Sequence, residues 1–151
     1  MLARRELSAA QVAARLRRRG FDDGEVEAAV ARLRDDGSLD DVRTATVHAR
    51  RLAGTALRGP LRAEREIASL GIGRAVARAA VAETYAERGV ATVLEQALAR
   101  RLPAGATIAN RLHFARLYRY LIRQGFEPRL VNATLRNRGG ASAPPEDEES
   151  A

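Results

Sequence analysis

The chain has 151 residues and no cysteine, and its 26 basic residues, all arginine, outnumber 19 acidic ones to give a formal charge of +7. These numbers exclude disulfides, thiolate metal sites and a cysteine nucleophile, and they allow one ordinary domain or several small stacked units. No run approaches the ~20 apolar residues of a membrane span, and the start lacks an apolar signal-peptide core, so we expect a cytoplasmic protein without a membrane partner.

The arginine excess is concentrated ahead of an acidic tail. The last acidic residues are Glu146, Asp147, Glu148 and Glu149, and without them the formal charge of the chain is +11. Such a charge attracts polyanions or acidic protein surfaces. A GC-rich coding sequence also favours arginine over lysine, but that bias does not explain the excess over acidic residues.

The first predicted helix runs from about Ser8 to Arg19, because Ser8 and Gln11 form a capping box and apolar residues follow at helical spacing. Gly20 ends it. Arginines fill its last turn and aspartates open the next helix, as the helix dipole favours at each end. Phe21, between the two helices, is predicted to be the buried apolar residue of the corner.

The other helices follow from apolar spacing and from Gly, Pro and Asx boundaries. They are predicted at about residues 22–36, 40–56, 60–70, 74–87, 90–101, 107–124 and 128–137. In the long helix, Thr107 is taken as the start because Asn110 follows three residues later. No segment alternates with a period of two, so strands are not expected and the predicted fold class is all-α.

Three glycine corners recur along the chain. They are Gly20-Phe21, Gly71-Ile72 and Gly125-Phe126, with their glycines 51 and 54 residues apart. Apolar residues stand four positions before each glycine and nine after each corner residue: Leu16, Ile67 and Leu121, then Val30, Val81 and Leu135. A generic two-helix corner could produce one such match. Three matches favour tandem three-helix repeats that form an elongated, curved body.

The predicted limits of the repeats are residues 1–37, with a short first helix, then 38–89 and 90–138. Residues 139–151 are rich in Gly, Pro and acidic residues, with nothing to bury, and we expect them to be disordered.

Four short motifs, in this order and spacing, resemble the RecX family of regulatory proteins. They are Arg4-Arg5-Glu6 with Ser8; Leu39-Asp40-Asp41 with Arg43 and Ala45; Gly59-Pro60 through Gly71-Ile72; and Gln124-Gly125-Phe126. Together they span about residues 1–138. Ser38 and Thr44 depart from the pattern, because that family usually has aromatic residues there, and Ser69 stands where a basic residue is common. The helix expected before Ser8 is very short, which suggests an N-terminus that is clipped or whose start is wrongly assigned.

The resemblance implies a non-catalytic regulator that lies in the groove of the RecA recombinase filament on DNA. In that family, binding hinders filament extension and strand exchange and can block RecA-assisted cleavage of the SOS repressor, so the implied setting is DNA repair and recombination. The partners would be RecA and DNA, contacted directly or through the filament, and the protein would act as a monomer without cofactors.

Arginine clusters are the candidate contacts. In the middle of the chain they are Arg50, Arg51, Arg58, Arg62 and Arg65, and near the end they are Arg116, Arg119 and Arg123. Either set could instead be a solvated helix face. The run Arg17 to Arg19 could equally cap a helix end, and Tyr120, beside the later set, could stack on bases or belong to the core. Asp40 and Asp41 are interpreted as a helix cap with a neighbouring interhelix salt bridge.

Catalysis is not expected. His48 and His113 are the only histidines, they lie far apart in sequence, and neither has a partner at metal-ligand spacing, so surface or capping roles are expected. Two other functions stay open: a sequence-nonspecific nucleic-acid-binding protein, and a helical scaffold for another acidic partner.

Overall fold

The computed structural model describes residues 6–139, and within them the secondary structure is helical. The helices are α1 (Ala9–Arg18), α2 (Asp23–Asp35), α3 (Asp41–Gly54), α4 (Pro60–Ala68), α5 (Arg74–Arg88), α6 (Val90–Ala99), α7 (Arg111–Gln124) and α8 (Pro128–Arg138). One isolated parallel bridge joins Ile108 to Gly139, and no strand forms in this part of the chain. The predicted all-α class is confirmed.

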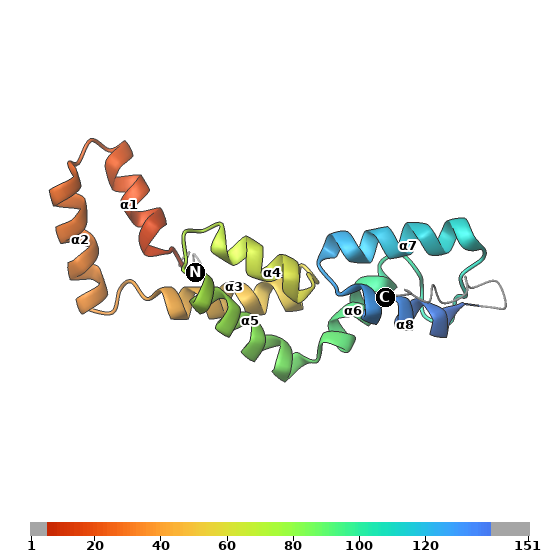
Figure 1. Ribbon diagram of the computed structural model, residues 1–151. Coiled ribbons are helices and arrows are strands. Elements are labelled where there is room, and N and C mark those ends of the chain that lie inside the picture. The colour runs from red at the N-terminus through yellow and green to blue at the C-terminus, as the bar shows by residue number, and fades with distance from the viewer. Residues whose placement is uncertain (1–5, 140–151) are drawn as a thin grey trace, which may run out of the picture.

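The helices pack in three consecutive groups that form an elongated row (Figure 1). In the first group α1 contacts α2; in the second, α3, α4 and α5 contact one another; in the third, α6, α7 and α8 do the same. A direct contact between α5 and α6 joins the second group to the third. The helices of the second group lie within residues 38–89 and those of the third within residues 90–138, and the predicted repeat limits stay a prediction. The short helix expected before Ser8 falls mostly outside the described residues, as does the tail after Gly139.

Side-chain caps set the starts of α1 and α2. Ser8 and Gln11 form the predicted capping box, and Asp22 and Glu25 form a second one. In each box the N-cap side chain accepts a hydrogen bond from the backbone N–H of the N3 residue, which has no partner inside the helix. The side chain of the N3 residue in turn accepts a hydrogen bond from the backbone N–H of the N-cap residue. The charge reversal between Arg19 and Asp22 therefore marks one helix end and one helix start.

The three corner glycines share a left-handed backbone. Their φ values are 95° for Gly20, 83° for Gly71 and 101° for Gly125, where a side chain would be strained. At the first corner the N–H of Phe21 donates to the carbonyl of Leu16, and at the third Phe126 donates to Leu121. This is the bond of a Schellman motif, which also brings together the apolar residues on its two sides.

The prediction that Phe21 is buried at its corner is wrong. Ile72 is 3 % exposed and Phe126 is 1 % exposed, whereas Phe21 is 48 % exposed. The physical reason lies in the packing partners. The second and third groups each contribute a further helix, α3 or α6, to their cores, whereas the described part of the first group contributes only α1 and α2. Its separate core is accordingly small, with Val26 and Val30 among its buried residues.

The predicted start of α7 at Thr107 is also wrong. Asn110 is the N-cap, and its side chain accepts the backbone N–H of His113. Residues before it are held in an extended path, because the N–H of Ile108 donates to the carbonyl of Arg138. A long-range backbone bond therefore competes with helix extension. The other helix ends differ from expectation by one or two residues, which is the usual fraying of a last turn.

The first and second groups meet at the start of α1. An Asp41 carboxylate oxygen accepts the N–H of Ala9 at 2.9 Å, so an acidic group from α3 lies at the positive end of α1. Ser8 is fully buried and donates its hydroxyl to the carbonyl of Leu70, which immediately precedes the corner at Gly71. The corner of the second group therefore packs on the first turn of α1.

The second and third groups meet at the start of α4 in a similar way. The N–H groups of Gly59 and Leu61 donate to the carbonyls of Gln124 and Gly125, at 2.7 and 3.1 Å. The negative end of α7 thus lies against the positive end of α4. A Cβ on Gly59 would lie 2.2 Å from the carbonyl carbon of Gly125, so this approach requires glycine.

Candidate partner-binding surface

The arginines predicted on the long helix form an exposed row. Arg116, Arg119 and Arg123 are exposed on α7, at positions that recur on one side of the helix. Their side chains make no ion pair or hydrogen bond with another residue of the range 6–139. We call these three residues the α7 row. Their charges are available to a partner, because no described acidic group neutralises them.

Tyr120 belongs to the core, and this decides between the two roles that the sequence left open for it, base stacking and core packing. It is 9 % exposed, and the guanidinium carbon of Arg101 lies 4.4 Å from the centre of its ring. That cation–π contact covers the ring face that a base would need for stacking. Tyr118 is half-buried and packs against the same core.

Two arginines of the middle cluster make contacts inside the molecule. Arg62 Nε donates to Glu66 Oε1 at 2.8 Å, and its Nη1 donates to the carbonyl of Arg123 at 3.2 Å. Arg58 pairs with the same carboxylate at 3.5 Å and donates to the side chain of Gln124. Both residues therefore fix the joint between the second and third groups, and Glu66 is shared by two cations.

The other three arginines of the middle cluster are exposed. Arg50 and Arg51 lie on α3, and their side chains make no ion pair or hydrogen bond with a described residue. Arg65 lies on α4 and donates only to the carbonyl of Leu61, one turn earlier. The structure thus separates the predicted cluster into two residues that hold the fold together and three that face solvent.

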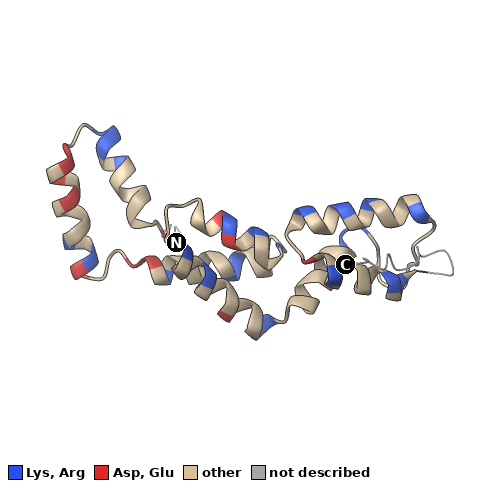
Figure 2. Ribbon diagram, in the orientation of Figure 1, with Lys and Arg blue, Asp and Glu red and all other residues tan. Residues whose placement is uncertain are grey.

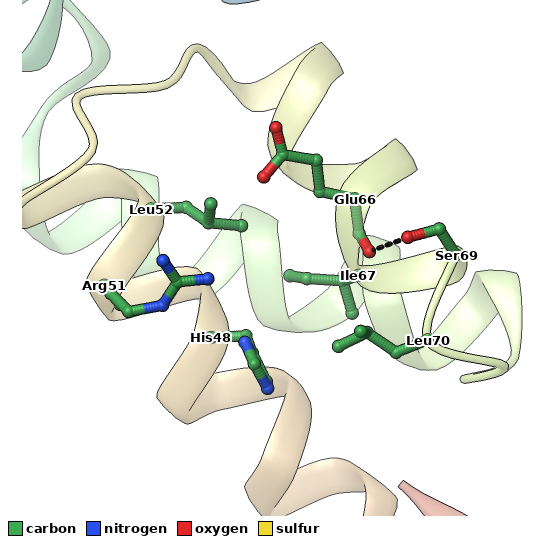
Figure 3. A pocket seen from close by; sticks show the side chains of 7 residues that line it. All are labelled: His48, Arg51, Leu52, Glu66, Ile67, Ser69 and Leu70. Atoms are coloured by element: carbon green, nitrogen blue, oxygen red, sulfur yellow. Dashed lines mark hydrogen bonds between the residues drawn. The ribbon is translucent and has the colours of Figure 1, made fainter. Parts of the chain in front are cut away.

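A recess opens between α3 and α4, and Arg51 forms part of its wall. Figure 3 draws its seven lining residues, which are His48, Arg51, Leu52, Glu66, Ile67, Ser69 and Leu70. Its volume is about 180 Å³. In Figure 3 the guanidinium of Arg51 points into the space between the helices. Sequence reasoning missed the recess, because its two walls are separated along the chain.

The motif residues Asp40, Asp41 and Arg43 have structural roles. Asp40 caps α3 by accepting the N–H of Arg43 at 3.1 Å, as predicted. Asp41 accepts the Ala9 N–H, so the contact between helices goes to a backbone group of α1. Arg43 donates to Glu6 and to the carbonyls of the loop that precedes α3. Asp41 and Arg43 therefore join the first group to the second, whereas Asp40 caps α3 within the second group.

The histidines do not come together. His113 caps the start of α7, where its Nδ1 accepts the N–H of Ala109 at 3.1 Å, and His48 lies on α3 at the recess. Among residues 6–139, no group of three or more His, Asp or Glu side chains is placed to hold a metal ion. No helix in the same range has the length and apolar character needed to cross a membrane.

Charge rises steadily along the row of helix groups. Residues 6–37 carry six arginines and seven acidic residues, residues 38–89 carry nine and six, and residues 90–138 carry nine and two. Figure 2 shows acidic residues along α2 at one end and arginines along α7 and α8 at the other. In the third group, Glu95 is paired with Arg138 at 3.0 Å. The third group is therefore the most cationic part of the described chain.

Fold and surface together define an all-α protein of consecutive helix groups, with exposed arginines suited to an acidic or polyanionic partner. A family profile described as "RecX, first three-helix domain" matches residues 1–33. Regulatory protein RecX from Syntrophotalea carbinolica is 35 % identical over 133 residues, covering 83 % of each chain. Regulatory protein RecX from Halorhodospira halophila is 31 % identical over 150 residues, covering 99 % of this chain and 86 % of that one. The chain belongs to the RecX family.

Two solved structures have the same fold. A crystal structure of regulatory protein RecX matches with a TM-score of 0.71 at 19 % identity, covering 87 % of this chain and 64 % of that one. RecX from Lactobacillus salivarius matches with a TM-score of 0.67 at 19 % identity, covering 87 % and 84 %. The chain also spans 55 % of the length of regulatory protein RecX from Geobacillus kaustophilus.

Proposed function

We propose that this protein is a non-catalytic regulator that binds the groove of the RecA–DNA filament and inhibits recombinase and SOS coprotease activity. Membership of a family of regulatory proteins supports a regulatory role. The observation that carries the contact chemistry is the α7 row, whose three exposed guanidinium groups lack a described partner. Guanidinium groups form strong charge-assisted hydrogen bonds with carboxylates and phosphates, so this row suits a groove lined by acidic side chains and nucleic acid.

The elongated shape supports the same proposal. A row of three helix groups (Figure 1) presents a long surface, along which separate contacts reinforce one another. Such a body can bridge neighbouring subunits of a helical filament or obstruct the approach of the next subunit. Inhibition then requires no chemical step, because occupancy of the groove alone hinders growth and access to partner DNA.

Binding to RecA filaments assembled on single-stranded DNA tests the proposal. Changing Arg116, Arg119 and Arg123 together to Gln should weaken binding at about 150 mM salt by about tenfold or more, since interfacial charge contacts are of this size. The matched control changes Arg15, Arg32 and Arg34 to Gln, which removes the same charge from exposed sites in the first group. Its effect should be clearly smaller. No binding of the unchanged protein to filaments would reject the proposal.

A second candidate, sequence-nonspecific nucleic-acid binding without a dedicated recombinase partner, is favoured by the charge gradient. The third group has nine arginines against two acidic residues, a balance typical of phosphate-binding surfaces. Each phosphate neutralised on duplex DNA lowers the slope of log affinity against log salt by about 0.9.

Bare DNA distinguishes the two functions. If all three arginines of the α7 row contact phosphates, the plot of log affinity for duplex DNA against log salt should be less steep for the triple variant, by about 2.7. Equal affinity for bare and RecA-coated DNA at one ionic strength would favour this second function. A marked preference for coated DNA would favour the first.

A further inference from the structure

The recess between α3 and α4 has the features of a binding site for one acidic side chain. Its volume, about 180 Å³, lies below the ~300–1,000 Å³ of pockets that enclose small molecules. Leu52 and Ile67, at 2 % and 0 % exposure, contribute apolar surface to its lining, and His48 and Ser69 add polar groups. A single side chain with an aliphatic stem and a polar end fits such a space.

Arg51 and Glu66 line the recess, and they differ in whether their charge is already paired inside the molecule. The Glu66 carboxylate is paired with Arg58 at 3.5 Å and with Arg62 at 2.8 Å, so its charge is compensated. Arg51 has no described acidic partner, and its guanidinium points into the gap (Figure 3). Ser69 donates its hydroxyl to the carbonyl of Glu66, so it is occupied locally. The free positive charge in the recess therefore belongs to Arg51.

The lining favours a carboxylate on a protein over a phosphate on a nucleic acid. A phosphate requires hydrogen-bond donors around its oxygens, whereas Leu52, Ile67 and Leu70 offer only apolar surface. A glutamate or aspartate side chain can place its methylene groups on that surface and its carboxylate on Arg51.

We propose that this recess anchors a single Glu or Asp side chain of a protein partner through Arg51. The inference rests on the proposed function for the identity of that partner, which would be the recombinase in the filament. The preference of the recess for a carboxylate does not depend on the proposed function.

The recess can be tested without the recombinase. In the full chain, NMR signals of the Arg51 Nε–H and of the Leu52 and Ile67 methyl groups should shift on titration with a short poly-glutamate peptide. Inorganic phosphate is the second probe, and it should shift them much less. Arg74 is exposed on α5 without a described partner and does not line the recess, so its Nε–H provides the internal control. Equal shifts with both probes, or none with the peptide, would overturn the proposal.

Filament binding then tests the anchor in its proposed setting. Arg51→Ala should weaken binding to RecA filaments about tenfold, the value of one charge-assisted hydrogen bond, and Arg74→Ala should change it less than about twofold. Ser69→Trp, which keeps every charge and blocks the recess, should weaken binding as Arg51→Ala does. Circular dichroism confirms folding of each variant.

The outcomes separate the two proposals. If the unchanged protein does not bind filaments, the proposed function fails, while the peptide titration still decides the recess. If it binds and Arg51→Ala weakens bare-DNA binding equally, the recess accepts phosphate and the proposal is wrong. If Ser69→Trp has no effect on filament binding, the recess is not an anchor.

Discussion

At the scale of single residues, the joint between the second and third groups depends on a small polar network around Arg58. Its side chain reaches Glu66 and Gln124, and its backbone carbonyl accepts the hydroxyl of Tyr85 at 2.6 Å. Tyr85 is 3 % exposed. Burial, followed by the negative charge of Glu66, raises the pKa of the Tyr85 phenol from 10.0 to about 12. The network therefore requires a neutral phenol.

Tyr85→Phe tests this network. At pH 8 the free energy of unfolding should fall by about 1–2 kcal/mol, because the Arg58 carbonyl loses its buried partner. The folded pKa lies above the unfolded one, so this contribution is fully present below about pH 10 and is lost as pH rises towards 12. The difference between the unchanged protein and the variant should therefore shrink over that range in urea unfolding.

Tyr118→Phe is the matched control, because Tyr118 is half-buried and its hydroxyl makes no hydrogen bond with a described group. Its stability should stay within about 0.5 kcal/mol of the unchanged protein. A stability difference for Tyr85→Phe that stays constant from pH 8 to pH 12 would contradict the role of the neutral phenol.

At the scale of helices, the groups are joined by helix ends. The corner before α8 packs on the start of α4, and the corner before α5 packs on the start of α1. In both joints a carbonyl beside the corner glycine accepts a donor from the N-cap residue of a helix in the preceding group. Small residues at the contact allow this approach, since a Cβ on Gly71 would lie 2.3 Å from the Cβ of Ala10.

Gly59→Ala tests the approach of α4 to the corner of the third group. Gly59 has an ordinary φ of −77°, so the added methyl introduces a steric clash with backbone and no strain of its own dihedral angle. Backbone cannot move aside as a flexible side chain can. Thermal or urea unfolding should show a loss of about 3 kcal/mol, at the upper end for overpacking.

Gly73→Ala provides the comparison within the same group. Gly73 is also an N-cap glycine without a side-chain cap, its φ is −56°, and nothing lies within 4 Å of a Cβ placed there. Both variants share the poorer capping of alanine, which costs less than about 1 kcal/mol here. The difference between them therefore measures the steric contact. Equal losses would contradict a close joint at Gly59.

At the scale of the whole molecule, charge is graded along the row of helix groups and the acidic tail follows the most cationic group. The four acidic residues after position 139 are tethered to a group of nine arginines. A tethered acidic segment competes with a polyanion at high effective concentration. We therefore propose that the tail weakens binding to bare DNA.

Truncation after Gly139 should tighten duplex-DNA binding. The effect should be larger at low salt, because higher salt screens the attraction between the acidic tail and the arginines. A variant that changes only Glu146, Asp147, Glu148 and Glu149 to Gln should reproduce the effect at full length. Both variants are measured beside the unchanged protein by fluorescence anisotropy at two salt concentrations. Unchanged affinity in both would reject the proposal.

Much of the local structure could be predicted from the sequence. Ser8 with Gln11, Asp40, and the glycines at 20, 71 and 125 placed helix starts and corners, because capping and left-handed backbone depend on neighbouring residues. The exposed α7 row was also predictable, since helical spacing sets which residues share a face. The start of α7 was not, because a bond from Ile108 to Arg138 decides it.

The sequence by itself determined the all-α class, the order of the helices, the corners and the arginine excess, all of which arise from interactions within a few residues or from composition. Only the tertiary structure decided that Phe21 is exposed, that Arg58 and Arg62 hold a joint, and that Arg51 borders a recess. These features depend on contacts between residues far apart in the chain. Helical periodicity states which face a residue occupies, but it does not state which other helix covers that face.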